Sequence, residues 1–329
     1  MAATQEDAPV RLRSGSQLDH YRLECVAARS GMASIFLGTD LRTGRAVAIK
    51  VPHPDVEDDP LLLQRFHQEE EIGRDLDHPA VMKVYADEHR SRPYMVMEWV
   101  EGKLLRDVLR GPDRIATDRA LRIARGICEA LEYIHSQGVV HRDLKPENVM
   151  IDAEDRVKLI DFGIAGRTAS KHTLRRLSDI MGSPEYISPE QVEGKRGDAR
   201  SDLYALGVIL YEMLTGATPF QGPNAFAIMN DRLQNNPIPP RELERSITPQ
   251  LQEIVYRAME RQPRHRYASA REFAHDLENP GAVEPADRGE LRDWSWRRTP
   301  LWKRVAFYSG LALLPVVIFS LLIWVARHG

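Results

Sequence analysis

Apolar and polar positions alternate in two different ways along the chain. Between residues 21 and 51, short β-branched and apolar runs are separated by Arg29-Ser30-Gly31 and by Arg42-Thr43-Gly44-Arg45, which predicts three antiparallel strands. A helical stretch at 61–76 and two strand-like runs, at 80–86 and 93–100, follow. This part of the chain therefore predicts a small, mainly antiparallel lobe.

Beyond residue 102 the apolar positions recur at helical spacing. Helices are predicted at 104–109, 117–137, 202–214, 249–259 and 269–277, and two short strands at 149–151 and 157–160. Residues 279–293 contain several Pro and Gly and predict a linker. The pattern favours an α+β protein whose first lobe is rich in strands and whose second lobe is helical.

The composition is that of an ordinary globular protein. The 45 Lys and Arg against 48 Asp and Glu give a charge of −3, and 43% of residues are apolar, which excludes a collagen-like or disordered chain and a wholly basic nucleic-acid binder. The two cysteines, Cys25 and Cys128, lack the spacing of zinc ligands. They predict two small buried side chains in a protein of a reducing compartment.

The C-terminal tail departs from this average. All 21 residues from 305 to 325 are uncharged and 17 of them are apolar. A helix of that length spans about 31 Å, which matches a hydrocarbon core of ~30 Å. Four basic residues precede the segment at 297–304, whereas only the basic residues Arg327 and His328 follow it. The positive-inside rule then predicts a single-pass, tail-anchored protein with its N-terminal side in the cytoplasm.

The segment 141–148 carries the most specific chemistry. It reads His-Arg-Asp-Leu-Lys-Pro-Glu-Asn, and Asp161-Phe162-Gly163 begins eighteen residues after Asp143. Transfer of a phosphoryl group needs a carboxylate for the hydroxyl proton, a cation for the phosphate and oxygen ligands for Mg²⁺. Asp143, Lys145, Asn148 and Asp161 supply these groups. Both motifs resemble the catalytic loop and the metal-binding motif of the protein kinase family in its Ser/Thr version.

The resemblance covers about residues 21–277 and implies a bilobal protein-kinase-like fold with ATP between the lobes. It implies that Asp143 is the catalytic base, that Lys145 contacts the γ-phosphate, and that Asn148 and Asp161 bind Mg²⁺ or Mn²⁺. Lys145 also favours Ser or Thr acceptors, because tyrosine kinases typically differ at this position.

A second motif, Val47-Ala48-Ile49-Lys50, resembles the strand whose lysine contacts the α- and β-phosphates. Its carboxylate partner must come from residues 69–71. Helical geometry turns Glu69 to the same face as the apolar residues, and turns Glu70 and Glu71 about 100° and 200° away. We therefore expect a Lys50–Glu69 ion pair and a solvated face at Glu70 and Glu71.

The family's glycine-rich loop is altered in this chain. Its three glycines should fall on positions 28, 30 and 33, which are Ala28, Ser30 and Ala33, although Gly31 is present. Because glycine lets the backbone approach the phosphates, we expect weakened ATP binding. The resemblance implies an ATP site formed by Ala27, Ala28, Ser30, Gly31, Ala33, Ile35, Ala48, Lys50, Met97, Glu98, Val100 and Met150.

The segment 161–190 resembles a regulated activation loop. Arg142, which precedes the catalytic Asp, implies control by phosphorylation, and the candidate hydroxyls are Thr168, Ser170, Thr173 and Ser178. Residues 182–190 resemble the substrate-docking end of such a loop, where Ser183 would reach Asp143 and Lys145. The resemblance also implies two scaffold roles, a Glu190–Arg266 ion pair and an Asp202 that holds the catalytic-loop backbone.

The chain as a whole is most similar to bacterial, eukaryotic-like Ser/Thr kinases with a C-terminal anchor. This implies transfer of the ATP γ-phosphate to proteins, including its own loop and a second copy in trans, at a bacterial inner membrane and without nucleic acid. We expect a flexible N-terminus (1–17), a kinase domain (18–279, with lobes 18–100 and 101–279), a linker and basic juxtamembrane segment (280–304), a membrane helix (305–325) and an external tail (326–329).

Two alternatives to this interpretation exist. The altered glycine loop favours a pseudokinase scaffold with weakened nucleotide binding. A small-molecule phosphotransferase of related fold is the other alternative, and the substrate-docking segment 182–190 argues against it.

Overall fold

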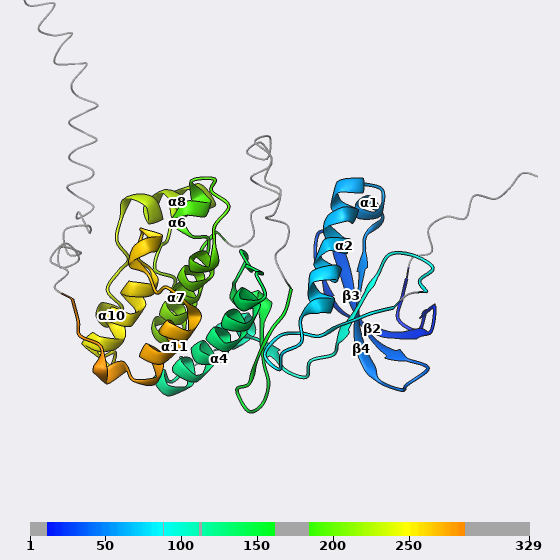
Figure 1. Ribbon diagram of the computed structural model, residues 1–329, viewed down its shortest axis with the longest axis horizontal. Coiled ribbons are helices and arrows are strands. Elements are labelled where there is room, and N and C mark those ends of the chain that lie inside the picture. Colours follow the sequence, from blue (N-terminus) through cyan, green and yellow to red (C-terminus); the bar gives the residue numbers. More distant parts are fainter. Residues whose placement is uncertain (1–11, 88, 112–113, 162–183, 287–329) are drawn as a thin grey trace, which may run out of the picture. The chain divides into compact units, whose positions relative to one another are not determined.

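The computed structural model describes residues 12–87, 89–111, 114–161 and 184–286 (Figure 1). The chain divides into a unit that ends at Pro285 and a second unit from Ala286 to Gly329. No helix among the described residues is long and apolar enough to cross a membrane. The predicted membrane segment at 305–325 lies outside them.

The first lobe is built on a six-stranded antiparallel sheet with the order β1-β2-β3-β4-β6-β5. Its strands are β1 (Gln17–Leu18), β2 (Tyr21–Arg29), β3 (Ala33–Asp40), β4 (Ala46–Pro52), β5 (Val84–Tyr85) and β6 (Met95–Glu98). The three predicted strands between residues 21 and 51 are β2, β3 and β4 (Figure 1), so that prediction is confirmed.

Two helices lie between β4 and β5 in the chain, α1 (Pro54–Glu57) and α2 (Pro60–Asp75). Helix α2 begins where the Asp59 carboxylate accepts hydrogen bonds from the Leu61 and Leu62 amides and Pro60 fills the first helical position. Its buried residues are Phe66, Glu70 and Gly73. Apolar packing therefore holds α2 at few points.

Exposed Cys25 is a correction to the sequence-based prediction, because Cys128 is buried and Cys25 is not. The strand pairing between β2 and β3 shifts register between Leu23 and Cys25. Such a bulge interrupts the two-residue alternation of side chains, so Cys25 does not share the buried face of Leu23.

The second lobe is mainly helical, as predicted. Its helices are α3 (Leu105–Leu109), α4 (Thr117–Ser136), α6 (Pro189–Val192), α7 (Ala199–Thr215), α8 (Ala225–Gln234), α9 (Pro240–Leu243), α10 (Pro249–Ala258) and α11 (Ala270–Glu278). A three-stranded sheet joins β7 (Lys103–Leu104), β8 (Val149–Ile151) and β9 (Val157–Leu159). The pattern of residues missed α8, since this helix buries only Ile228 and Arg232 and shows little helical periodicity.

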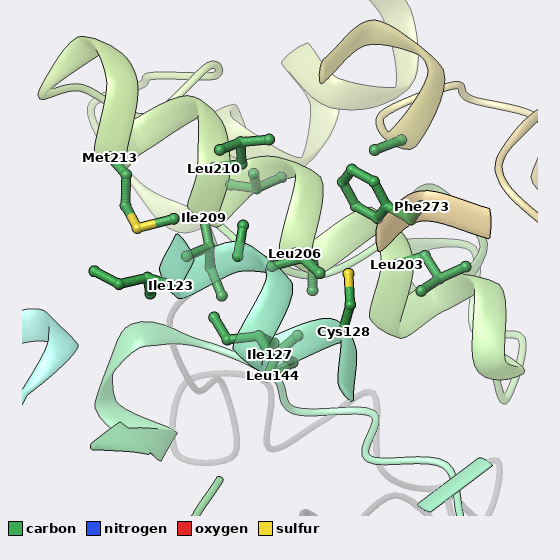
Figure 2. Packing of buried hydrophobic residues seen from close by; sticks show 14 of the residues in the cluster. Ile123, Ile127, Cys128, Leu144, Leu203, Leu206, Ile209, Leu210, Met213 and Phe273 are labelled. Carbon is green, nitrogen blue, oxygen red and sulfur yellow. The ribbon is translucent and has the colours of Figure 1, made fainter. Parts of the chain in front are cut away.

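Helix α7 lies at the centre of this lobe, and all its residues from Ser201 to Thr215 are buried. Figure 2 shows its apolar side chains beside those of α4 and Phe273 of α11. A Cβ added at Gly207 would lie 2.7 Å from the Cβ of Ala258, so glycine allows α7 and α10 to approach closely. The helix ends at Gly216, whose φ of 74° favours glycine.

Besides the covalent connection between them, the two lobes are joined by hydrogen bonds at β9. The Leu159 amide donates to the Ala80 carbonyl over 2.8 Å, and the Met82 amide donates to the Leu159 carbonyl over 2.9 Å. Lys158 forms an ion pair of 2.8 Å with Glu98 at the end of β6. These contacts fix the strand that leads to Asp161 against the first lobe.

Candidate active site

Lys50, Glu69 and Asp161 form one charged cluster. Lys50 lies on β4, Glu69 on α2, and Asp161 two residues after β9. The Lys50 Nζ is 2.5 Å from Glu69 Oε1 and 3.1 Å from Asp161 Oδ1. The predicted Lys50–Glu69 ion pair is therefore present, and the structure brings the third predicted residue to the same ammonium group.

The pKa values of the two carboxylates in this cluster are shifted in opposite directions. The positive charge of Lys50 lowers the pKa of Asp161 below its usual range. Burial raises the pKa of Glu69, the Lys50 charge opposes that shift, and the Asp161 charge adds to it. Burial alone would lower the pKa of Lys50, but the two carboxylates outweigh it and raise that pKa. Asp161, with half of its side chain exposed, therefore stays ionised.

The catalytic-loop residues predicted from the sequence lie together. Lys145 Nζ is 2.6 Å from Asp143 Oδ2, and the Asn148 side-chain amide donates to the Asp143 carbonyl oxygen over 2.8 Å. Asn148 itself is buried. One carboxylate, one ammonium and one amide thus converge within a stretch of six residues.

Asp202 of α7 fixes the backbone of this loop, as predicted. Its carboxylate accepts hydrogen bonds from the amides of His141 and Arg142 over 2.9 and 2.7 Å, and it lies 2.8 Å from the His135 ring. Arg142 has a φ of 64°, which is uncommon for a residue with a side chain. The buried carboxylate therefore stabilises a strained backbone just before Asp143.

A cavity of about 460 Å³ lies beside the charged cluster. Nine of the twelve predicted ATP-site residues line it, namely Ala27, Ala28, Ile35, Ala48, Lys50, Met97, Glu98, Val100 and Met150, together with Glu69, Asn148 and Asp161. Ser30, Gly31 and Ala33 are not among its lining residues. The lining also includes seven residues that were not predicted, Met82, Trp99, Glu101, Gly102, Leu104, Glu147 and Ile160.

The tip between β2 and β3 closes on itself, which explains why it does not line the cavity. The Ser30 amide donates to the Ala33 carbonyl over 2.9 Å, while the Ser30 hydroxyl accepts from the Met32 and Ala33 amides over 3.3 and 3.1 Å. His53 holds the same tip, because its amide donates to the Met32 carbonyl and its ring contacts the Ser34 hydroxyl. The Ser30 hydroxyl thus stabilises the tip through two hydrogen bonds that a glycine could not form.

Asn148 and Asp161 suit a divalent cation such as Mg²⁺. Both line the cavity, and they offer an amide oxygen and an ionised carboxylate, the hard oxygen ligands that Mg²⁺ prefers. Within the part of the chain that the structure describes, no group of three or more His, Cys, Asp and Glu could hold a metal alone. Mg²⁺ is usually held by one or two carboxylates together with substrate phosphates and water.

Comparison with known proteins decides what kind of domain this is. A family model described as "Protein kinase domain" matches residues 29–277. The chain belongs to the protein kinase family. The kinase is 38% identical over 265 residues to serine/threonine-protein kinase PknB of Mycolicibacterium smegmatis, which covers 79% of this chain and 42% of that protein.

Other relatives agree with this assignment. A probable serine/threonine-protein kinase of Streptomyces coelicolor, SCO3848, is 40% identical over 264 residues, covering 78% of this chain and 39% of that protein. The crystal structure of the Mycobacterium tuberculosis PknI kinase domain superposes with a TM-score of 0.64 at 25% identity, covering 82% of this chain and 99% of that one. The kinase thus spans about two fifths of the length of the two curated relatives.

The scaffold pair of the kinase is formed as predicted. Arg266 and Glu190 meet through two hydrogen bonds of 2.8 and 2.7 Å, and both side chains are buried. Burial alone would raise the pKa of Glu190, but the hydrogen bonds and charge of Arg266 outweigh it and lower that pKa to about 2.

The described end of the predicted substrate-docking segment makes one contact that the sequence did not predict. Buried Arg232 of α8 donates to the backbone carbonyls of Pro184 and Glu185, and its guanidinium lies over the rings of Tyr204 and Phe220. A lone arginine in a weakly periodic segment gives no signal of this role. The candidate phosphosites Thr168, Ser170, Thr173 and Ser178, and the docking residue Ser183, lie outside the described residues.

Glu70 is a second correction, because we predicted it on a solvated face and it is 3% exposed. Its carboxylate is 2.6 Å from the Arg90 guanidinium. The helical rotation that separates Glu70 from Glu69 is right, but the Arg90 side chain covers the carboxylate of Glu70. Glu71 is exposed, as predicted.

Proposed function

We propose that this chain is a Ser/Thr protein kinase that transfers the γ-phosphate of ATP to protein hydroxyl groups. The observation that carries the proposal is the ammonium group of Lys50, which contacts the carboxylates of both Glu69 and Asp161. All three residues line a largely apolar cavity. The similarity to proteins named serine/threonine-protein kinases supports the acceptor class.

Each polar group has a role that follows from its charge and position. Lys50, oriented by Glu69, donates hydrogen bonds to phosphate oxygens. Asp143 orients the acceptor hydroxyl and takes its proton, and Lys145 places a positive charge beside the transferred group. A divalent cation held by Asn148 and Asp161 would supply neutralisation of phosphate charge.

Incorporation of labelled phosphate from ATP in the presence of Mg²⁺ tests the proposal. We expect the full chain to label itself and a mixture of Ser and Thr peptides, and Asp143→Ala and Lys50→Met to lose at least about a hundredfold in rate. Asp152→Ala, a carboxylate in the turn between β8 and β9, is the matched control and should keep full activity. Equal labelling of the wild type and of the Asp143 and Lys50 variants would contradict the proposal, and nucleotide binding without any transfer would favour the pseudokinase scaffold.

We also propose that the kinase phosphorylates its own segment 161–190. Four hydroxyl residues among basic side chains support this, and Thr168 and Thr173 are the leading acceptors. Mass spectrometry of an Asp143→Ala chain incubated with active wild type should find phosphate at one of these two positions. Phosphate confined to residues outside 161–190 would contradict the assignment.

The segment 305–325 is proposed to anchor the protein in a membrane, with the kinase domain on the cytoplasmic side of a bacterial inner membrane. Its support is the run of 21 uncharged residues preceded by four basic ones. The full chain should then remain in the membrane fraction after carbonate extraction, whereas Leu313→Lys combined with Val317→Lys should release it. Release of the wild-type chain by carbonate would contradict the proposal.

A further inference from the structure

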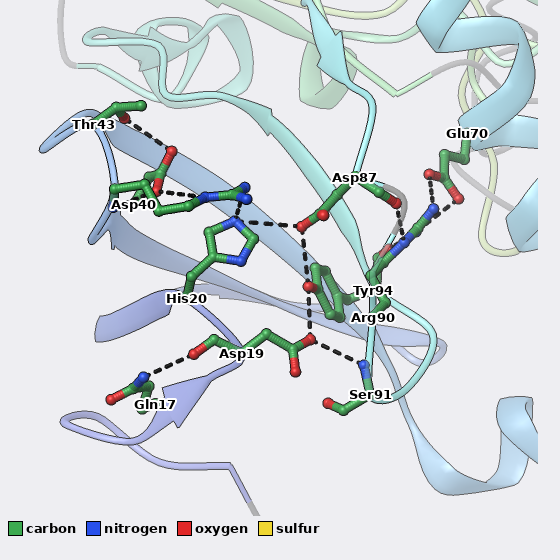
Figure 3. A network of polar contacts seen from close by, with 11 residues as sticks. Gln17, Asp19, His20, Asp40, Thr43, Glu70, Asp87, Arg90, Ser91 and Tyr94 are labelled. Atoms are coloured by element: carbon green, nitrogen blue, oxygen red, sulfur yellow. Dashed lines mark hydrogen bonds and ion pairs between the residues drawn. The ribbon is translucent and has the colours of Figure 1, made fainter.

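Arg90 contacts helix α2 at Glu70. This residue is the neighbour of Glu69, whose carboxylate belongs to the charged cluster with Lys50 and Asp161. The Arg90 Nη1 and Nη2 atoms donate to the two Glu70 oxygens over 3.0 and 2.6 Å. The same guanidinium donates to the backbone carbonyls of Asp87 and Tyr94. Figure 3 shows Arg90 between Glu70 on one side and Asp87 and Tyr94 on the other.

Helix α2 depends on this contact because few apolar side chains hold it. Phe66 is its single buried apolar side chain, and the other two buried residues are Glu70 and Gly73, which has no side chain. Glu69 and Glu70 point about 100° apart around the helix axis. An ion pair on each of these two faces, to Lys50 and to Arg90, fixes the rotation of α2, whereas either pair alone would leave the helix free to roll.

The loop that carries Arg90 is itself fixed to the sheet. The Tyr94 hydroxyl lies 2.8 Å from the Asp19 carboxylate and 3.2 Å from the Asp87 carboxylate, so its one hydrogen is shared between these acceptors, and the Ser91 amide donates to Asp19 over 3.0 Å (Figure 3). Tyr94 is completely buried. Arg90 therefore connects α2 to a rigid support rather than to a freely moving loop.

We propose that Arg90 and Glu70 are positioning residues for phosphoryl transfer, which hold α2 in the rotation that presents Glu69 to Lys50. The inference rests on the proposed kinase activity and adds to it a pair outside the ATP cavity. A guanidinium is required, because its planar fork serves both carboxylate oxygens and two carbonyls at once, which an ammonium group cannot do.

A double-mutant cycle in the full chain tests this role. In the wild-type background, Arg90→Lys should lower kcat/KM for phosphoryl transfer by on the order of 10- to 100-fold, because it misplaces Glu69. In a Glu69→Gln background the same change should cost less than about twofold, since the group to be positioned is already gone. Arg92→Lys is the matched control, because Arg92 ties the same loop to Glu57 of α1 and should cost less than about twofold in both backgrounds.

A second measurement separates this proposal from the proposed function. Hydrogen exchange at the backbone amides of residues 61–75 should speed up in Arg90→Lys and in Glu70→Gln, and stay at the wild-type rate in Arg92→Lys. Equal losses of kcat/KM in both backgrounds, or unchanged exchange in α2, would overturn the positioning role. A wild-type chain that transfers no phosphate would overturn the proposed function, and the exchange measurement would then decide the positioning role alone.

Discussion

Helices α2 and α7 both hold a residue of the active site, but they are anchored in opposite ways. Helix α7 is buried along its length from Ser201 to Thr215 and presents Asp202 to the catalytic loop. Helix α2 buries three residues, one of them charged, and presents Glu69 to Lys50. The catalytic loop is thus fixed by a hydrophobic core, whereas the Lys50–Glu69 pair depends on polar contacts.

This difference indicates where substitutions can change the geometry of the active site without unfolding the protein. Apolar packing is dense and non-directional, so a helix within it has one position. Polar anchors are directional and can be lost one at a time. We therefore expect substitutions near α7 to change stability and activity together, and substitutions near α2 to change activity more than stability.

The largest effect is expected for Asp202→Ala. It leaves the buried amide of His141 and the partly buried amide of Arg142 without their acceptor, and the His141 amide alone costs about 1–3 kcal/mol in the free energy of unfolding. It also frees the strained loop before Asp143, so kcat should fall by about a hundredfold or more. Urea denaturation and single-turnover kinetics measure the two effects. Asp198→Ala, at the start of the same helix, should cost only about 1 kcal/mol, and an equal loss in both variants would show that Asp202 acts only on the helix.

Removal of the Glu190 charge should have the next largest effect. Glu190→Gln breaks a buried pair with Arg266 and should cost about 3–5 kcal/mol in the free energy of unfolding. Because the folded pKa is lowered to about 2 from an ordinary value of 4.5, this stability is present above pH 4.5 and is lost as the pH falls toward 2. The difference between wild type and variant should shrink over that range. The exposed pair Lys195–Glu193 provides a control, since Glu193→Gln should change stability by less than about 1 kcal/mol at any pH.

Truncation of one apolar side chain in each helix compares the two anchors directly. Leu206→Ala in α7 should cost about 2–5 kcal/mol, because its site is completely enclosed. Phe66→Ala in α2 should cost less stability than Leu206→Ala but lower kcat/KM more in relation to that loss. Thermal unfolding and steady-state kinetics of both variants provide the ratio. Equal ratios of activity loss to stability loss would contradict the distinction between the helices.

The smallest effect is expected at the β2–β3 tip. Ser30→Gly removes the hydroxyl that accepts from the Met32 and Ala33 amides, and frees both for phosphate oxygens. KM for ATP should fall a few-fold, or about 1 kcal/mol, with little change in kcat. Ser30→Ala removes the same hydroxyl but keeps the Cβ. It therefore separates the effect of losing the hydroxyl from the effect of the greater backbone freedom of glycine. A higher KM in both variants would show that the closed tip favours nucleotide binding.

Much of the fold and of the candidate site could be predicted from the sequence, because both depend on local patterns. The strands between 21 and 51, the helix that carries Glu69, and the groups at 143–148 are each specified within one short segment. Helical rotation favoured Glu69 over its two neighbours, although it also placed Glu70 in solvent, where the structure does not have it.

The wrong burial predictions and the missed cavity residues arise where contacts between segments distant in the sequence determine the environment of a side chain. Glu70 was placed in solvent because nothing in its own helix indicates that Arg90 covers it. Cys25 was expected to be buried because a bulge cannot be seen in a residue pattern. Met82 and Trp99 reach the cavity only after the strands β5 and β6 have paired.

The network around Asp19 has a practical consequence for anyone who shortens this protein. The family match begins at residue 29, which is the last residue of β2. A chain started there would lose Asp19, and with it the acceptor of Tyr94 and Ser91. It would also leave β3 as an unpaired edge, which promotes aggregation. An expression boundary before Gln17 keeps β1 and β2 in the sheet beside β3, and with them the support of the helix that carries Glu69.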